Sequence, residues 1–114
     1  ESPAIHVARR LLEEKAEVVV TDPRALDNAK ADLRGLDGKI RFVQDPYRAA
    51  QGCQAIAVMT EWGLYRGLDY EKLYQRMVRP AFIFDGRNIL DHRRCHEIGF
   101  NVYPLGRPAL THFT

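Results

Sequence analysis

The sequence predicts an α/β fold: a three-layer, Rossmann-like domain whose sheet is mostly parallel and lacks its first strand. Short apolar runs rich in β-branched residues alternate with segments of helical pattern, which is typical of a parallel sheet with helices on each side. The runs are apolar at consecutive positions, as in strands buried on both faces. The first pattern is a helix, yet a crossover helix should follow a strand, and the chain has none there. We therefore expect a piece of a larger protein, with either a gap between the "EVVVT" and "AIAVM" strands or a rearranged sheet.

Two helices and two strands are expected in the first part of the chain. Residues 1–15 form a predicted helix, because Ser2 can cap it, Pro3 suits its first position and apolar residues recur at helical spacing. The β-branched run "AEVVVTD" is a strand that ends at Asp22. The polar segment "RALDNAKADLRG" follows as a helix or an irregular crossover, and "KIRFV" is a short strand.

Aspartates mark the starts of three helices in the rest of the chain. Asp45 precedes a short helix that Gly52 ends. Asp69 precedes "YEKLYQRM", and Asp91 precedes "HRRCHEI". The strands "AIAVMT" and "AFIF" lie between these helices, and "FNVYPLG" follows the last one. The segment "EWGLYRG" is expected to be a loop with glycines.

The helix after Asp69 is expected to carry Leu73, Met77 and Val78 on one face. Residues 1–107 form the predicted domain, and residues 108–114 are expected to be a loose tail.

The composition describes an ordinary globular protein of one domain. Its 114 residues are 46% hydrophobic and 28% charged, and 17 Lys and Arg against 15 Asp and Glu leave a net charge of +2. This balance does not indicate a broad surface for nucleic acid, and no apolar run approaches the roughly 18 residues of a membrane span. Cys53 and Cys95 are too few for a disulfide scaffold, so we expect reduced thiols and a cytoplasmic location.

The end of the "AFIF" strand carries the first candidate site. Asp85, Gly86 and Arg87 follow the strand directly, and ligands of open α/β sheets bind at the carboxyl ends of the strands. Gly86 lets the backbone turn sharply or approach a ligand, and the guanidinium of Arg87 can make paired hydrogen bonds to a phosphate or carboxylate. The alternative interpretation is a turn glycine beside a surface arginine.

Two further strand ends carry polar residues. Thr60, Glu61 and Trp62 end the neighbouring strand, where Trp62 can pack on the next helix or face a sugar or a base. Asp22 sits where a dinucleotide fold places the acid that binds a ribose, but no glycines form GxG in this chain. We interpret Asp22 with Pro23 as a turn.

Histidines and cysteines do not predict a metal centre. His92, Cys95 and His96 have ligand-like spacing on one helix, but a fourth ligand is not evident and arginines lie between them. A solvated helix face is the favoured interpretation, and we expect no metal. Cys53 has no histidine nearby in the sequence, which makes it a poor nucleophile.

Several motifs together resemble a known family. "ESPAIHVARRLLEEKAEVVVTDP", "DPYRAAQGCQAIAVMTEW", "LDYEKLYQRMVRPAFIFDGRNILD" and "EIGFNVYPLGR" resemble the carboxyl-terminal, UDP-binding domain of UDP-glucose 6-dehydrogenases, in the UDP-glucose/GDP-mannose dehydrogenase family. The resemblance runs from Glu1 to about Arg107, in the order and spacing of that family.

The resemblance implies a domain of an oxidoreductase that converts UDP-glucose to UDP-glucuronate with NAD. The catalytic cysteine and the NAD fingerprint of the family lie in its amino-terminal dehydrogenase domain, so this chain alone is expected to be inactive. The arginine of the family's FDGR motif contacts the sugar nucleotide, and that role maps onto Arg87. By the same resemblance, Asp85, Gly86, Glu61 and Trp62 are expected at the substrate cleft, and the parent is expected to be a homo-oligomer.

Two alternatives stay open at this point. The same domain occurs in dehydrogenases that act on GDP-mannose or a UDP-N-acetylhexosamine. A non-catalytic nucleotide-binding module is the other alternative, although such a module should contain the centre of its own sheet.

Overall fold

The computed structural model describes residues 18–21, 40–59 and 63–112, which belong to two compact units, Glu1–Ala49 and Ala50–Thr114. The predicted helix at 1–15 and the helix or irregular crossover expected at 24–35 lie outside the described residues. The candidate site residues Thr60, Glu61 and Trp62 lie outside them too, as does Asp22. In the described part of the chain, no helix is both long enough and apolar enough to cross a membrane.

The first unit contains a pair of parallel strands. Strand β1 (Val18–Val20) pairs with β2 (Ile40–Phe42), with Val18 opposite Ile40. The Thr21 hydroxyl, just after β1, donates to the carbonyl oxygen of Gln44 at 3.0 Å. Both strands were predicted as β-branched or apolar runs, and both predictions are confirmed.

Helix α3 (Pro46–Ala50) follows β2 where the sequence places it. The Asp45 carboxylate accepts a hydrogen bond from the Tyr47 N–H at 3.0 Å, which satisfies a backbone donor at the start of the helix. Gly52 lies beyond the helix with φ 76°, a left-handed conformation that suits glycine.

The second unit is a parallel α/β sheet. Its three strands, β3 (Ala55–Val58), β4 (Phe82–Asp85) and β5 (Asn101–Pro104), run in the order β3-β4-β5, with every pairing parallel. The 3-10 helix η1 (Gly63–Gly67) and α4 (Tyr70–Arg76) connect β3 to β4, and α5 (His92–Ile98) connects β4 to β5. The expected loop "EWGLYRG" therefore contains a 3-10 helix, and the predicted parallel α/β fold is confirmed.

Among the described strands, β1 pairs only with β2, and β3 pairs only with β4. The described strands thus form two separate hydrogen-bonded sheets, one in each unit.

Both helices of the second unit begin at the predicted aspartates. Asp69 accepts from the Lys72 N–H at 3.2 Å, and Asp91 accepts from the Arg94 N–H at 3.1 Å. Helix α5 ends at Gly99, whose φ of 139° is accessible to glycine and to few other residues.

Alternate residues of the strands face the two helices. The register aligns Ile56, Ile83 and Val102 across the sheet, and Ile83 and Val102 have no exposed surface. Leu73 and Met77 come from the α4 segment. Phe100 is fully buried, and its ring makes an edge contact with the Tyr74 ring at 5.1 Å between centroids.

Val78 does not join this core. It is 49% exposed while Leu73 and Met77 are buried, and the prediction that the three residues share one helix face is wrong. The reason is local: α4 ends at Arg76 and Met77 is extended, so the helical periodicity does not reach Val78.

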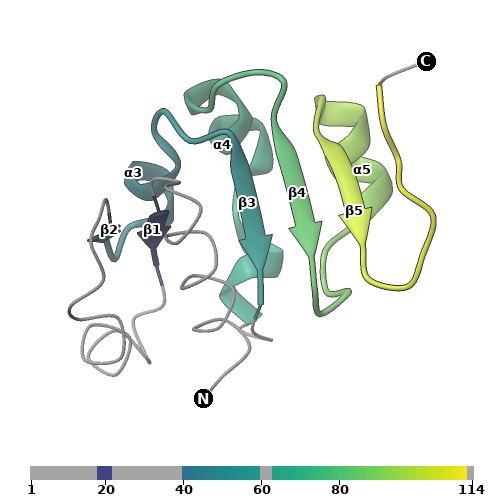
Figure 1. Cartoon of the computed structure of the whole chain (residues 1–114), viewed down its shortest axis with the longest axis horizontal. Helices are drawn as coiled ribbons and strands as arrows, with labels where there is room; N and C mark the ends of the chain where they lie inside the picture. The colour runs from purple at the N-terminus through teal and green to yellow at the C-terminus, as the bar shows by residue number, and fades with distance from the viewer. Residues whose placement is uncertain (1–17, 22–39, 60–62, 113–114) are drawn as a thin grey trace. The chain divides into compact units, whose positions relative to one another are not determined.

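The opposite face of the sheet carries aromatic side chains. The rings of Phe84 and Tyr103 stack at 5.2 Å, Phe82 stacks on Phe84 at 6.4 Å, and Phe84 is 45% exposed. Full burial on both faces is therefore wrong for β4. Figure 1 shows α4 and α5 on the same side of the sheet, as expected when successive right-handed crossovers advance in one direction.

The tail differs from the expected loose end. Leu110 forms an antiparallel bridge with Val102 through backbone hydrogen bonds of 2.8 and 2.9 Å. The His112 N–H donates to the buried side chain of Asn101 at 2.7 Å. Residues 110–112 are thus attached to the edge strand β5.

Candidate functional site

The turn after β4 lies at the carboxyl edge of the three-stranded sheet. The Gly86 N–H donates to the carbonyl oxygen of Val58 at 2.8 Å, and the Leu105 N–H donates to that of Asp85 at 3.0 Å. These bonds tie the turn to the ends of both neighbouring strands. Arg87 therefore leaves the sheet from its middle strand, at the edge where ligands of open α/β sheets bind.

The turn leaves little space for a side chain at Gly86. A Cβ at this position would lie 3.1 Å from the Val58 carbonyl oxygen and 3.3 Å from the Met59 sulfur. The backbone at Gly86 passes close to β3, so a side chain would push the turn away from the sheet.

Asn88 completes the turn in a left-handed conformation, with φ 54°. Its side-chain amide donates to the carbonyl oxygen of Leu105 at 2.8 Å. Its Oδ1 is buried and has no hydrogen-bond partner within the described residues.

Asp85 is a buried carboxylate at the centre of the turn. It is 1% exposed, and its side chain lies on the same face of the sheet as that of Ile83, toward the helices. Oδ1 accepts from the Arg87 N–H at 3.1 Å, whereas Oδ2 accepts from the Leu90 N–H at 2.9 Å and lies 2.8 Å from Nε2 of His92. Asp85 thus organises the turn through contacts to Arg87, Leu90 and His92.

Two opposing effects set the pKa of Asp85. Burial raises this pKa, because the charged carboxylate loses hydration. Hydrogen bonds from Leu90, His92 and Arg87, with the charge of His92, act in the other direction, and the net pKa lies below its ordinary value of 3.8. The carboxylate is therefore ionised at neutral pH.

Arg87 is exposed, whereas the acid beside it is buried. Within the FDGR motif, Asp85 is thus buried and holds the turn, whereas Arg87 carries its positive charge at the surface. The predicted companions of Arg87 at the cleft, Glu61 and Trp62, lie outside the described residues, so the motif alone makes up the described part of the site.

The three residues with metal-like spacing on α5 lie in three different environments. His92 contacts Asp85, and Cys95 is buried, where loss of hydration raises the pKa of its thiol to about 12. His96 lies 2.9 Å from the Thr111 carbonyl oxygen and stacks on His112, with ring centroids 4.1 Å apart. Within the described ranges, no group of three or more potential ligands could hold a metal ion.

Sequence reasoning missed the pairing of His92 with Asp85. The two residues are seven positions apart, and the intervening turn brings the first residue of α5 back to the end of β4. An acid at a strand end with a histidine at the start of the next helix was the available signal.

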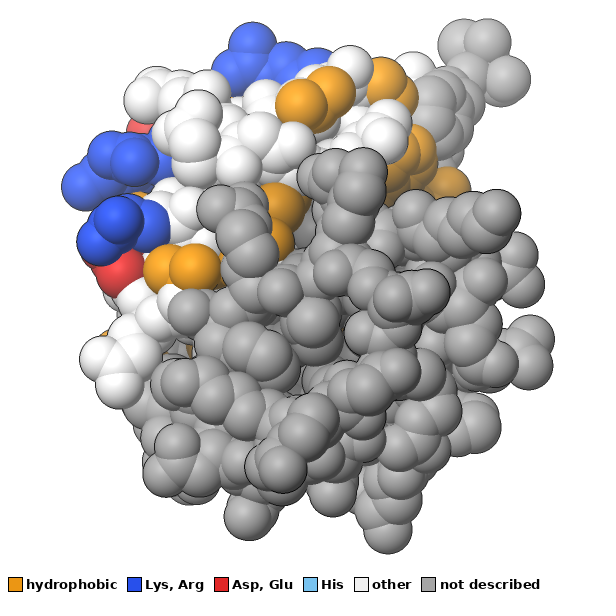
Figure 2. Space-filling view, turned by 60° about the vertical axis from the view of Figure 1, so that its left-hand side comes forward, with side chains coloured by type: hydrophobic (Ala, Val, Ile, Leu, Met, Phe, Trp, Pro, Cys, Tyr) orange, Lys and Arg blue, Asp and Glu red, His pale blue; other side chains and the backbone are white. Residues whose placement is uncertain are grey.

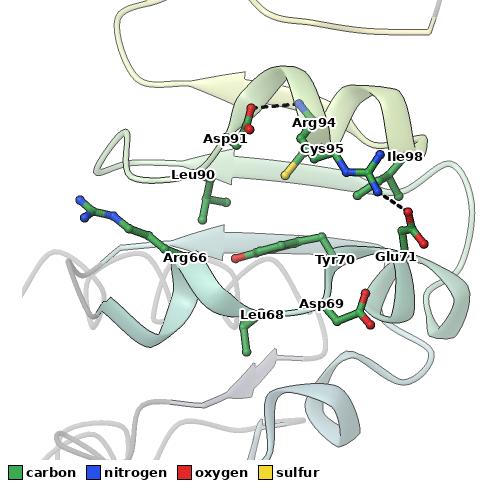
Figure 3. A pocket seen from close by; sticks show the side chains of 10 residues that line it. All are labelled: Arg66, Leu68, Asp69, Tyr70, Glu71, Leu90, Asp91, Arg94, Cys95 and Ile98. Atoms are coloured by element: carbon green, nitrogen blue, oxygen red, sulfur yellow. Dashed lines mark hydrogen bonds and ion pairs between the residues drawn. The ribbon is translucent and has the colours of Figure 1, made fainter.

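A pocket of about 330 Å³ lies between η1, α4 and α5 (Figure 3). Arg94 lines it, but its guanidinium forms an ion pair with Glu71, and Asp69 and Asp91 add carboxylates to the lining. Arg87 does not line this pocket. Because its charges are mixed and partly paired, the pocket is poorly suited to a diphosphate.

Figure 2 shows one face of the molecule, on which the described Lys and Arg side chains lie in separate groups at the top and at the left of the view. The described part of this face carries no single broad cationic patch. This distribution fits the small net charge of +2.

Comparison with known proteins gives a consistent result. Residues 1–92 match the model of the UDP-glucose/GDP-mannose dehydrogenase family, UDP binding domain. UDP-glucose 6-dehydrogenase 1 of Arabidopsis thaliana is 35% identical, and UDP-glucose 6-dehydrogenase 5 of Oryza sativa subsp. japonica is 37% identical, each over 95% of this chain. UDP-glucose 6-dehydrogenase 1 of Glycine max is 36% identical. The chain spans 26% of the length of each of these relatives.

Proposed function

Because the chain belongs to the UDP-glucose/GDP-mannose dehydrogenase family, as its UDP binding domain, we propose that it binds UDP-glucose and contacts the diphosphate through Arg87. The observation that carries this proposal is the exposed guanidinium at the carboxyl edge of the sheet, on a turn held from both neighbouring strands. A planar guanidinium can make two parallel, charge-assisted hydrogen bonds to phosphate oxygens.

A rigid backbone at Arg87 makes this contact stronger. The backbone of Arg87 is bonded to Asp85, and Gly86 is packed against β3, so little freedom of the turn is lost when a ligand binds. In this proposal Asp85 and Gly86 position the arginine, while Glu61 and Trp62 form the edge of the substrate cleft.

The parent enzyme is proposed to oxidise UDP-glucose to UDP-glucuronate with NAD. The residues of this chain do not fit an NAD site, because none of the eight glycines forms the GxG of a dinucleotide turn. We therefore assign NAD and the catalytic cysteine to the amino-terminal dehydrogenase domain of the parent, and no chemical step to this chain. A homo-oligomer in the cytoplasm is proposed for the parent, and the two free cysteines are compatible with that compartment.

The test is to replace Arg87 with alanine in the full-length protein and measure binding of UDP-glucose by calorimetry. Loss of one partner of a desolvated charge pair costs on the order of 2 to 5 kcal/mol, so the dissociation constant should rise at least about tenfold. The Michaelis constant for UDP-glucose should rise similarly, with that for NAD little changed.

Arg93→Ala is the matched control, because Arg93 is an exposed arginine on α5. Its affinity for UDP-glucose should equal that of the wild type. Unchanged affinity in Arg87→Ala would remove Arg87 from the site. Assays with GDP-mannose and a UDP-N-acetylhexosamine would show whether glucose is the preferred sugar.

A further inference from the structure

His92 is the side chain that connects helix α5 to the candidate site. Its Nε2 lies 2.8 Å from Oδ2 of Asp85, the imidazole is 11% exposed and the carboxylate is 0% exposed. Because the carboxylate is ionised, it can only accept, so Nε2 must carry the proton of this hydrogen bond. The contact is therefore a hydrogen bond, largely shielded from solvent, that His92 of α5 donates to Asp85 at the end of β4.

The bond restricts how the carboxylate can rotate. The imidazole and the Leu90 N–H both donate to Oδ2, which leaves Oδ1 directed at the Arg87 N–H, 3.1 Å away. Without His92, the backbone of Leu90 alone would hold Oδ2. The carboxylate would then have more freedom, and the tie to Arg87 would be weaker.

We propose that His92 is a positioning residue for the sugar nucleotide: it orients the Asp85 carboxylate, which fixes the backbone of Arg87 and so the point from which the guanidinium reaches the diphosphate. This inference rests on the proposed contact between Arg87 and the diphosphate. It assigns a role in ligand binding to a residue on α5 that does not itself contact the ligand.

Two amide substitutions that differ in side-chain length test the hydrogen bond between His92 and Asp85. In the full-length protein, His92→Ala and His92→Asn remove or shorten the donor, and the dissociation constant for UDP-glucose should rise about fivefold to tenfold. His92→Gln places an amide N–H near the position of Nε2 and should stay within about twofold of the wild type, given the cost of one hydrogen bond. Equal affinity of the Gln and Asn variants would overturn the proposal.

His96→Ala is the matched control for stability. His96 is on the same helix and also contacts an oxygen through Nε2, but that oxygen is the backbone carbonyl of Thr111 in the tail and not a carboxylate. This variant should bind UDP-glucose as the wild type does, even if its melting temperature falls. If His92→Ala does not fold, the comparison of Asn with Gln decides.

A double-mutant cycle separates this inference from the proposed function. If His92 acts through Arg87, then His92→Ala should change affinity by less than about twofold in an Arg87→Ala background. An additive effect would show that His92 acts by another route. If Arg87→Ala binds normally, the proposed function fails. If Arg87→Ala binds weakly and His92→Ala binds normally, only this inference fails.

Discussion

At the scale of single residues, Asp85 is the side chain on which the turn depends. Asp85→Asn removes the charge and places an NH₂ group among the donors of Arg87, Leu90 and His92. Hydrogen bonds to charged groups contribute about 1.5–3 kcal/mol each, so we expect the free energy of unfolding at pH 7 to fall by about 2 kcal/mol or more. Urea unfolding followed by circular dichroism measures this loss.

The pH dependence of this loss gives a second readout for Asp85. Its folded pKa lies below the ordinary value of 3.8, so the folded state binds fewer protons than the unfolded state. The ionised Asp85 carboxylate therefore stabilises the fold fully above its ordinary pKa. This stabilisation is lost as pH falls below about 4, through the pKa of the folded state. The gap in unfolding free energy between wild type and Asp85→Asn should therefore narrow in acid. Asp91→Asn is the matched control at an exposed helix cap, and it should cost less than about 0.5 kcal/mol because Asn caps helices about as well as Asp. A cost equal to that of Asp85→Asn would contradict the central role of Asp85.

Residue-scale prediction from sequence succeeded where the chemistry is local. Asp69 and Asp91 were recognised as caps because a cap binds a backbone N–H three residues on. The strand-end position of Arg87 followed from the pattern of the "AFIF" run. The contact of His92 with Asp85 was missed, because it depends on the path of a turn that local pattern does not encode.

At the scale of elements, the end of α5 is fixed by Gly99. An added Cβ would lie 2.5 Å from the Tyr74 ring, and the φ of 139° is unfavourable for any other residue. The ring has little room to move, because Arg79 lies 4.4 Å over it and Phe100 contacts it at 5.1 Å. Gly99→Ala should therefore lower the unfolding free energy by about 2–4 kcal/mol, as measured by urea denaturation.

Gly106→Ala is the matched control at this scale. Gly106 also has a positive φ, 70°, but its Cβ would meet nothing within 4 Å. Only backbone strain of about 1 kcal/mol is expected there. Equal losses for the two variants would mean that the contact of Gly99 with Tyr74 is unimportant.

At the scale of the whole molecule, the sequence predicted the class of sheet but not how each strand is covered. Consecutive apolar residues in "AFIF" suggested burial on both faces, yet Phe84 is 45% exposed. Whether a face of a strand is buried depends on the side of the sheet on which each crossover helix packs. In the second unit α4 and α5 lie on the same side (Figure 1). Hydrophobic pattern indicates which residues tolerate burial, whereas topology decides which of them are buried.

The two sheets predict unequal stability of the two units. A two-stranded sheet is marginal by itself, whereas three strands packed against helices can be stable. β1 and β2 form such a pair, while β4 has a strand on each side and contains the fully buried Ile83. In the 114-residue chain, amide hydrogens of β4 should exchange at least about 100-fold more slowly than those of β1 and β2, a difference of about 2.7 kcal/mol in local opening. Hydrogen exchange with mass spectrometry measures these rates. Equal protection of β1 and β4 would show that other contacts stabilise the first strand pair as well as the three-stranded sheet is stabilised.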